Sequence, residues 1–440
     1  MPADIAVRCF EKEGIDCDIY SALMKTAQSL PLEEQMRIYS CASCAATGEM
    51  RELLEIKSFS CVREMVKDGI IVDGLSAVIP VVKNEKIQIS LPLRVNWCGG
   101  WTDTPPYCLE NGGAVVNAAV KINNLLPVQV RIEKLHEPKV ILEYFDSGNR
   151  AEFYEANELS DLTNPLEPFP LLKSALIACG IVAMPGEKSK ENLFDKLDGG
   201  IYISAGVVGI PKGSGLGTSS ILLAACIMGI FDYIGQEASD AEICRSVLLA
   251  EQLMGTGGGW QDQAGGMKNG IKLISSERGR RQEVVSENLN VPKEFFDEIN
   301  ERFCLVYSGK RRLGRTILRE IMGGYIQSNP LFIVTLKETY SLADEMKRNI
   351  ESGNINGFIS NLNRQMELTK TLDTGFTNEQ LDRIFYACAD MTDGKMICGA
   401  GGGGFVQIIL KKGYSKQDLS ERLKASFPLQ GIDVWMCDFI

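Results

Sequence analysis

Histidine is almost absent from this chain of 440 residues, in which His136 is the only one. Ser/His/Asp and Cys/His catalysis both need an imidazole beside the nucleophile, and many metal sites use one as a ligand. His136 lies in Leu135-His136-Glu137-Pro138, which we interpret as a surface turn between two strands. Acid–base and metal chemistry should therefore fall on carboxylates, hydroxyls, lysines and arginines.

Long apolar runs and basic clusters are also missing. The apolar run 221–231 is about half of the roughly 20 residues that a membrane-spanning helix needs, and residues 1–14 are charged rather than signal-like. We therefore expect no membrane partner, no export and a cytoplasmic location. Lys and Arg number 46 against 57 Asp and Glu, a net charge of −11, so no extended nucleic-acid surface is expected.

The 14 cysteines form no recognisable framework. Cys41-Ala42-Ser43-Cys44 has the spacing of a redox site or half a zinc site, but no second pair of cysteines or histidines completes four ligands. Without a signal segment, we interpret the cysteines as reduced thiols.

Apolar periodicity divides the chain into three parts. Residues 1–80 form a helical extension, with helical spacing over 19–30, 32–40 and 49–66. Residues 81–300 and 301–440 each mix strands with helices, so the fold class is α+β, with two lobes behind the extension. The expected strands cover 87–97, 125–133, 140–145, 201–208, 302–308, 405–410 and 433–439; helices are expected over 169–179, 219–233 and 241–254.

The glycine-rich segment Gly209–Ser220 lies between an apolar strand and an apolar helix. Glycines let successive N–H groups turn toward an anion, and the helix that follows adds unpaired N–H groups and the positive end of its dipole. Thr218 and Ser219 could also offer hydroxyls to Mg²⁺. The segment lacks the spacing of a P-loop or of a dinucleotide fingerprint, so it predicts a phosphate site or a plain strand-to-helix turn.

Two further segments carry polar groups suited to phosphoryl transfer to a sugar. Trp101 and Asp103 stand in a turn after a strand, where an indole can cover C–H surfaces and a carboxylate can accept hydroxyl protons. Glu251 ends a helix and Asp262 follows a glycine run, which supplies one acid for Mg²⁺ and one to orient a hydroxyl. The alternatives are a buried Trp with a capping Asp, and a solvated Glu.

With these segments in this order, the chain resembles the GHMP kinases. The matching motifs are 94–103, the phosphate loop 211–220 and the late glycine-rich segment 397–404, which is a second backbone wall or a tight turn. The resemblance implies the GHMP kinase fold, with the active site between two lobes, and the use of ATP and Mg²⁺.

Within that superfamily the chain is similar to the L-fucokinase branch. It shares Gly-Gly-Trp-x-Asp-Thr-Pro-Pro, Gly-Ser-Gly-Leu-Gly-Thr-Ser-Ser-Ile-Leu and Thr-Gly-Gly-Gly-Trp-Gln-Asp-Gln. The resemblance implies transfer of the ATP γ-phosphate to the anomeric hydroxyl of L-fucose, in a salvage route to GDP-fucose. Several such kinases follow a nucleotide-sugar pyrophosphorylase, so residues 1–80 are a candidate linker or remnant of such a fusion.

The resemblance also assigns roles by position. Asp262 would be the catalytic acid facing the sugar hydroxyl, Arg94 would neutralise charge near the transferred group, and Glu251 would hold Mg²⁺ with Thr218 or Ser219. The remaining candidates bind ATP, namely Lys212, Gly213, Ser214, Gly215, Leu216, Gly217, Thr218 and Ser219, or bind the sugar, namely Gly100, Trp101, Asp103, Trp260 and Arg312.

One departure from the galactokinases bears on the sugar. Those enzymes carry Glu-His where this chain has Gly100-Trp101, and their Glu helps to bind the hydroxymethyl arm. Fucose has a methyl there, which an indole can cover without leaving a carboxylate unpaired. The alternatives are a heptose phosphate as substrate, with Lys310, Arg311, Arg312 and Arg315 holding its phosphate, a sugar and nucleotide sensor without catalysis, or a decarboxylase.

Overall fold

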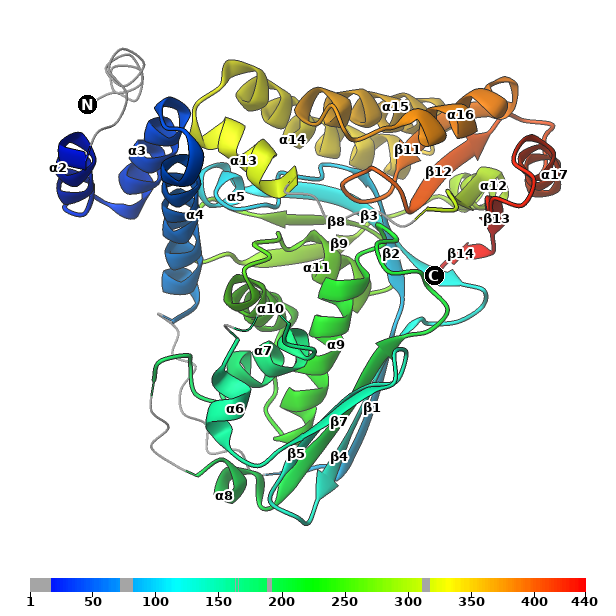
Figure 1. Ribbon diagram of the computed structural model, residues 1–440. Coiled ribbons are helices and arrows are strands. Elements are labelled where there is room, and N and C mark those ends of the chain that lie inside the picture. Colours follow the sequence, from blue (N-terminus) through cyan, green and yellow to red (C-terminus); the bar gives the residue numbers. More distant parts are fainter. Residues whose placement is uncertain (1–16, 72–81, 163, 165, 188–191, 311–316) are drawn as a thin grey trace.

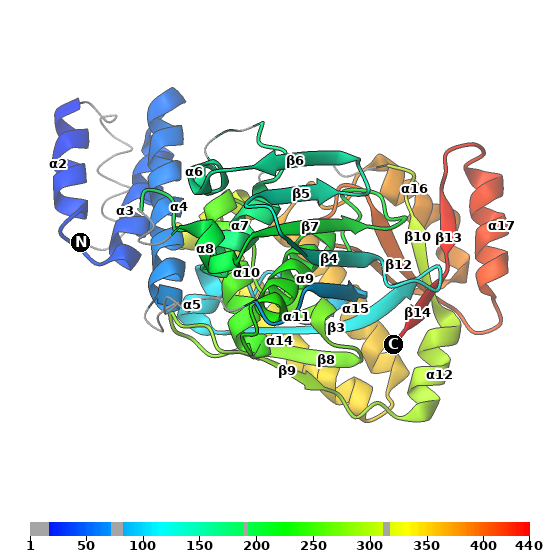
Figure 2. The same ribbon diagram turned by 90° about the horizontal axis from the view of Figure 1, so that it is seen from below.

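The computed structural model describes residues 17–71, 82–162, 164, 166–187, 192–310 and 317–440. Three helices come first: α2 (Cys17–Ala27), α3 (Leu32–Ala45) and α4 (Gly48–Ile71). Figures 1 and 2 both place them at one end of the molecule, beside α5 (Tyr107–Asn111). Arg37 of α3 makes a two-point ion pair with Glu110 of α5, at 2.6 and 2.7 Å, which ties the extension to the rest of the chain.

The first sheet runs in the order β1-β4-β7-β5-β6, and Figure 2 shows β4, β7, β5 and β6 in that succession. Only β5 and β7 pair in parallel. The long helix α9 lies along this sheet, and α7 and α10 pack on α9 (Figure 1). The bounds are β1 Lys86–Leu91, β4 Val128–Leu135, β5 Val140–Tyr144, β6 Asn149–Phe153, β7 Gly200–Val207, α7 Pro170–Ala178, α9 Thr218–Tyr233 and α10 Asp240–Met254.

The other strands of the described ranges form two more sheets. One runs β14-β3-β8-β9, with β2 also paired to β3, and the other runs β11-β12-β10-β13. The helices α14 and α15 pack against β2, β3 and β11. The bounds are β2 Leu93–Cys98, β3 Gly113–Ile122, β8 Ile271–Ser276, β9 Val284–Asn288, β10 Phe303–Tyr307, β11 Thr392–Ile397, β12 Phe405–Leu410, β13 Asp433–Trp435, β14 Cys437–Phe439, α14 Pro330–Glu351 and α15 Ile355–Leu372.

The remaining helices are short or lie at the periphery: α6 Ala156–Ser160, α8 Leu193–Leu197, α11 Gln261–Met267, α12 Lys293–Arg302, α13 Ile317–Ile326, α16 Glu379–Ala387 and α17 Lys416–Ser426. The α+β fold class is thus confirmed. No helix among the described residues combines the length and the apolar character needed to cross a bilayer. His136 is exposed in the connection between β4 and β5, as expected.

Two expected strands are each divided between two sheets. The run 87–97 breaks at Pro92, because proline has no N–H to donate, and β1 and β2 join different sheets. The run 433–439 breaks at Met436, which is 54% exposed and whose carbonyl accepts a hydrogen bond from the Asn123 N–H. The chain changes sheet at that residue.

Trp97 occupies the centre of the core. Its ring is fully buried and meets Phe358 of α15 and Phe439 of β14 edge-on, at centroid distances of 5.0 and 5.5 Å. Aromatic edge-to-face pairs add to the stabilisation from burial alone. Because β2, α15 and β14 all contribute, this cluster joins elements from both halves of the sequence directly behind the motif that starts at Arg94.

Candidate active site

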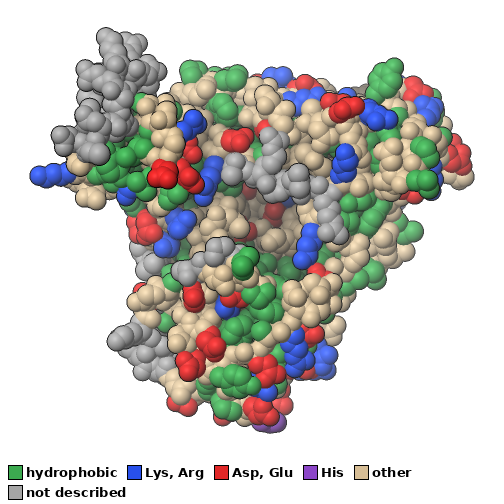
Figure 3. Space-filling view, in the orientation of Figure 1, with side chains coloured by type: hydrophobic (Ala, Val, Ile, Leu, Met, Phe, Trp, Pro, Cys, Tyr) green, Lys and Arg blue, Asp and Glu red, His purple; other side chains and the backbone are tan. Residues whose placement is uncertain are grey.

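A cavity of about 430 Å³ gathers most of the candidate residues from sequence. Its walls come from the end of β2, the loop between β7 and α9, residues 256–262, α13, α15 and residues 399–400. Figure 3 shows the hollow between the upper and lower parts of the molecule, with acidic side chains inside it. The site is therefore built from segments spread over more than 300 residues of sequence.

The phosphate loop forms one wall of this cavity. Gly213, Gly215 and Gly217 have φ values of 75°, 80° and 76°, a left-handed conformation that favours glycine. A Cβ on Gly215 would overlap the carbonyl of Cys398, and one on Gly399 would lie 2.8 Å from the Gly215 Cα. The late glycine-rich segment therefore packs directly on the loop, and two of its residues, Gly399 and Ala400, line the cavity.

The helix α9 begins at the edge of the cavity. Its N-cap is Gly217, and no side chain caps its first turn, so N–H groups at this end have no side-chain partner. Thr218, Ser219 and Ser220 line the cavity at the same point. Unpaired N–H groups and three hydroxyls, at the positive end of a sixteen-residue helix, suit the phosphates of a nucleotide.

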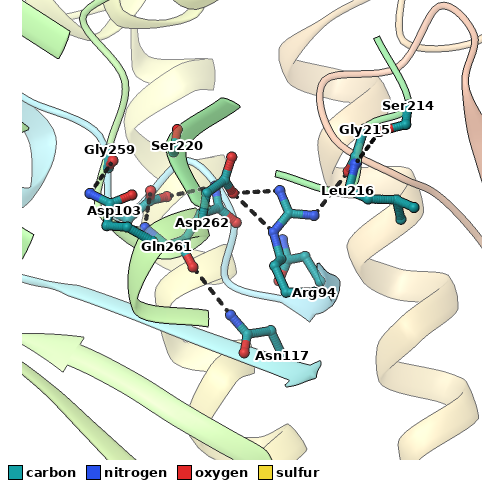
Figure 4. A network of polar contacts seen from close by, with 12 residues as sticks. Arg94, Asp103, Asn117, Ser214, Gly215, Leu216, Ser220, Gly259, Gln261 and Asp262 are labelled. Atoms are coloured by element: carbon teal, nitrogen blue, oxygen red, sulfur yellow. Dashed lines mark hydrogen bonds and ion pairs between the residues drawn. The ribbon is translucent and has the colours of Figure 1, made fainter. Parts of the chain in front are cut away.

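Arg94 and Asp262 form a charged pair between the loop and the floor of the cavity. The Arg94 Nε donates to Asp262 Oδ1 at 2.9 Å, and its Nη1 donates to the Gly215 carbonyl at 2.9 Å (Figure 4). The Arg94 side chain is only 3% exposed, whereas Asp262 is 26% exposed. One guanidinium therefore fixes both the phosphate loop and a carboxylate that faces the cavity.

Asp103 lies on the other side of Asp262 and is fully buried. Its Oδ2 accepts from the Gln261 N–H at 3.2 Å and its Oδ1 from the Gln261 side-chain amide at 3.1 Å (Figure 4). Burial raises the pKa of Asp103 to about 7, and the charge of Asp262 acts in the same direction. Both oxygens already have one donor, so a sugar hydroxyl would use their remaining lone pairs.

Glu251, at the end of α10, lies behind the cavity wall rather than on it. It is buried, and its Oε1 accepts from the Ser220 hydroxyl in a short hydrogen bond. Burial raises the pKa of Glu251 to about 7; the hydrogen bond from Ser220 acts against this rise, and the charges of Asp262 and Asp103 act with it. The structure thus brings Glu251 to the Ser220 hydroxyl, rather than to the Thr218 or Ser219 hydroxyl that the family resemblance suggested.

The oxygen ligands available here fit magnesium better than zinc. Within the described ranges, no three His, Cys, Asp or Glu side chains are close enough to hold a metal by themselves. Mg²⁺ commonly takes one or two carboxylates together with phosphate oxygens and waters. Glu251 and the three hydroxyls at the start of α9 are a donor set of that kind.

Other candidates from sequence are distributed unevenly around the cavity. Gly100 and Trp101 line it, and Trp101 adopts φ = 79° while packing against the apolar cluster of α13. The ring of Trp260 is instead fully buried, its indole N–H donates to Gln282 at 3.3 Å, and it does not line the cavity. Lys212 and Leu216 are not on the wall, and Arg312 lies outside the described residues.

Several wall residues escaped the sequence argument: Asn96, Ser220, Gln261, Gln365 and Thr369. Asn96, Ser220 and Gln261 stand inside the motifs quoted above, so closer attention to their polar side chains would have found them. Gln365 and Thr369 lie on α15, four residues apart on one helix face, and no local pattern marks them. Asn96 Oδ1 and Gln261 Oε1 are buried without a hydrogen-bond partner in the part of the chain that is described.

The fold and the sequence are both similar to those of the GHMP kinases. Residues 187–270 match the family described as GHMP kinases N terminal domain. The chain also shares the fold of the Methanococcus jannaschii mevalonate kinase, with a TM-score of 0.58 and 19% identity over 81% of this chain and 99% of that one. Residues 187–270 therefore match the N-terminal domain of the GHMP kinases, and the expected family resemblance is confirmed.

Two curated relatives are more similar to this chain in sequence. The chain is 34% identical to the bifunctional fucokinase/GDP-fucose pyrophosphorylase of Arabidopsis thaliana, over 78% of this chain and 32% of that protein. It is also 34% identical to the L-fucokinase/L-fucose-1-P guanylyltransferase of Bacteroides fragilis, over 81% of this chain and 38% of that protein. The chain thus spans about a third of the length of these relatives.

A third relative matches along its whole length but at lower identity. The D-glycero-alpha-D-manno-heptose 7-phosphate kinase of Campylobacter jejuni is 23% identical to this chain. The match covers 79% of this chain and 98% of that protein. Its identity to this chain is about a third lower than that of the two bifunctional relatives.

Proposed function

We propose that this chain transfers the γ-phosphate of ATP to the anomeric hydroxyl of L-fucose and so forms fucose 1-phosphate. The observation that carries the proposal is the position of Asp262, which Arg94 holds between the phosphate loop and the Asp103–Gln261 pair. The similarity to two proteins whose names include fucokinase supports the choice of sugar.

Asp262 orients the sugar hydroxyl and accepts its proton as the new O–P bond forms and the bond from the γ-phosphorus to the leaving ADP breaks. A carboxylate in this role has to face the cavity and stay within reach of the acceptor, and Asp262 is the partly exposed member of the three acids. Arg94 stabilises negative charge on the transferred group while holding Asp262 in place. Because its guanidinium is almost fully buried, its interactions act in a medium of low dielectric constant.

The backbone from Gly213 to Ser219 holds the nucleotide phosphates, assisted by the N-terminus of α9. Glu251 and the adjacent hydroxyls, Ser220 foremost, would hold Mg²⁺. When bound, the metal neutralises charge on the β- and γ-phosphates. Lys212 and Leu216, which do not reach the cavity, act in this scheme only by shaping the loop.

Trp101 and Asp103 select the sugar. The indole of Trp101 lies on the cavity wall against the apolar cluster of α13, a surface suited to the methyl group of fucose. Asp103 accepts from sugar hydroxyls through the lone pairs that Gln261 leaves free. Trp260 supports the floor from below, and its buried position gives it no direct contact with the sugar in this proposal.

A fusion to, or association with, a nucleotide-sugar pyrophosphorylase in the cytoplasm belongs to the same proposal. Its support is that both 34% identical relatives are named as two-activity proteins and are about three times as long as the matching region. We also propose the division of the chain into a helical extension, residues 1–80, and two kinase lobes, residues 81–300 and 301–440.

The test of substrate is a coupled ADP-release assay with L-fucose, D-galactose, D-mannose and heptose 7-phosphate, followed by phosphorus NMR of the product. We expect L-fucose to give the highest kcat/KM and an anomeric phosphate. A heptose 7-phosphate kinase, the second candidate because of the match to the Campylobacter protein, would reverse that order.

The test of mechanism is Asp262→Asn, which keeps the shape and removes the proton acceptor. We expect kcat to fall by about 10²-fold or more, with L-fucose and an ATP analogue still bound in calorimetry. Asp297→Asn is the matched control, because Asp297 pairs with Lys293 on the exposed face of α12. Full turnover in Asp262→Asn would remove Asp262 from this role.

A further inference from the structure

A second cavity, of about 340 Å³, lies where the helical extension meets the kinase. α4 contributes Phe59, Val62 and Arg63, and α13 contributes Leu318 and Arg319. The third side is formed by Gln252 and the loop 255–257 that follows α10. Figure 1 shows α4 standing beside the kinase, with α10 and α13 as its neighbours.

The charged groups of this cavity are all cations. Its lining includes two arginines and no Asp or Glu. The Arg319 guanidinium lies 6.0 Å from the centroid of the Phe59 ring, and Phe59 and Arg63 are one helical turn apart on α4. Neither arginine has an ion pair with any residue in the described ranges. Both guanidinium groups can therefore pair with an anionic ligand in this cavity.

One neutral polar side chain of the lining has a hydrogen-bond donor without an acceptor in the described part of the chain. Gln252 is only 4% exposed, and its Nε2 has no hydrogen-bond partner among the described residues. A buried amide donor without an acceptor is costly, so a ligand with acceptor oxygens would satisfy it. Phe59 and Pro105 add apolar surface beside these donors.

We propose that this second cavity binds a phosphorylated monosaccharide, with its phosphate on Arg63, Arg319 and Gln252 and its ring against Phe59 and Pro105. A phosphate offers several acceptor oxygens and up to two negative charges, which match two guanidinium groups better than a single carboxylate does. The volume exceeds that needed by a free phosphate and accommodates a sugar as well.

This cavity shares part of its wall with the first one. Thr256 and Leu318 line both. The Thr256 N–H and hydroxyl both donate to the Glu251 carbonyl at 3.1 Å, and a Cβ on Gly258 would overlap the Glu251 carboxylate. A ligand that contacts the loop 255–257 therefore acts on the position of Glu251, so occupancy of the second cavity alters turnover. That consequence rests on the proposed kinase activity, whereas the binding does not.

Binding is measured by calorimetry with inorganic phosphate and with fucose 1-phosphate as probes. Saturating ATP analogue, Mg²⁺ and L-fucose are present, so that the phosphate loop and the sugar site are filled. We expect the Kd for fucose 1-phosphate to rise at least tenfold in Arg63→Gln and in Arg319→Gln. Arg51→Gln, which removes a charge from the exposed face of the same helix, should change it less than twofold.

Equal affinity in all four proteins, or no saturable binding of either probe to the parent, would overturn the proposal. Kinetics then separate the two sources of the phosphate. If kcat for L-fucose responds to fucose 1-phosphate in the parent and not in Arg319→Gln, the ligand is an effector. If heptose 7-phosphate is an acceptor whose KM rises in the arginine variants, the ligand is the phosphate arm of a substrate. If the parent protein binds fucose 1-phosphate but shows no kinase activity, the proposed function is refuted and the proposed binding site is not.

Discussion

Replacing Gly217 by alanine should slow the kinase more than its effect on stability explains. Gly217 is the N-cap of α9 and has φ = 76°, where an L-residue is strained. An added Cβ would lie 3.1 Å from the Asp262 Cβ and Cγ and 3.3 Å from its Oδ2. The methyl therefore presses on the carboxylate that Arg94 holds.

The size of the effect follows from two separate costs. The left-handed conformation costs an alanine about 1–2 kcal/mol in the folded protein. The contact with Asp262 is tighter than van der Waals contact by a few tenths of an ångström, so the carboxylate has to move by about that distance. Since a misplacement of about 1 Å can cost 10²-fold in rate, we expect a loss in kcat of about 3- to 10-fold.

Gly209→Ala separates these costs. Gly209 has φ = 68° in the same connection between β7 and α9, but a Cβ there would meet nothing within 4 Å. Urea unfolding should show a similar loss of stability in both variants, whereas steady-state kinetics at saturating L-fucose and ATP should show a lower kcat only in Gly217→Ala. Equal kcat values in the two variants would refute the placement of Asp262 against the loop.

Three further outcomes can be tested in the same way. The pKa of Asp103 is raised from 3.8 to about 7, so the folded state binds more protons than the unfolded state between those pH values. The free energy of unfolding should therefore fall as pH rises from about 4 to 7. Measured by urea unfolding in EDTA, this free energy should depend less steeply on pH in Asp103→Asn. Ser220→Ala removes the hydroxyl that donates to Glu251, so we expect half-maximal activity to need at least fivefold more Mg²⁺. Ser220→Thr keeps a hydroxyl and should need about the same Mg²⁺ concentration as the parent. Trp101→His should lower the ratio of kcat/KM for fucose over galactose about tenfold, the scale of a lost methyl contact; an unchanged ratio would remove Trp101 from substrate choice.

The phosphate loop could be predicted from sequence because its signal is local. An apolar strand, a run of glycines and an apolar helix stand next to one another, and the structure has β7, the loop and α9 in that order. Pro92 was an equally local signal for the break between β1 and β2, and the apolar run across it concealed that signal. Local chemistry was therefore sufficient wherever one segment builds its own structure.

The direction of single side chains was harder to predict. Trp260 stands beside Gln261 and Asp262 in sequence, yet its ring turns under Gly113, where a Cβ would lie 2.6 Å from the indole. The direction of the Trp260 ring depends on how α11 packs on its neighbours, and no sequence motif indicates that packing. Gln365 entered the site because its side-chain oxygen accepts from the Gly99 N–H at 2.9 Å, across 266 residues of sequence.

The three acids of the site differ in environment, and this difference assigns their work. Burial and the neighbouring charge of Asp262 raise the pKa of both Asp103 and Glu251 to about 7. Asp262 instead pairs with the Arg94 guanidinium and faces the cavity, which in the proposed function is where the sugar hydroxyl meets the γ-phosphate. Moving Arg94 would therefore disturb all three acids at once, because it is the one cation among the described residues that pairs with any of them.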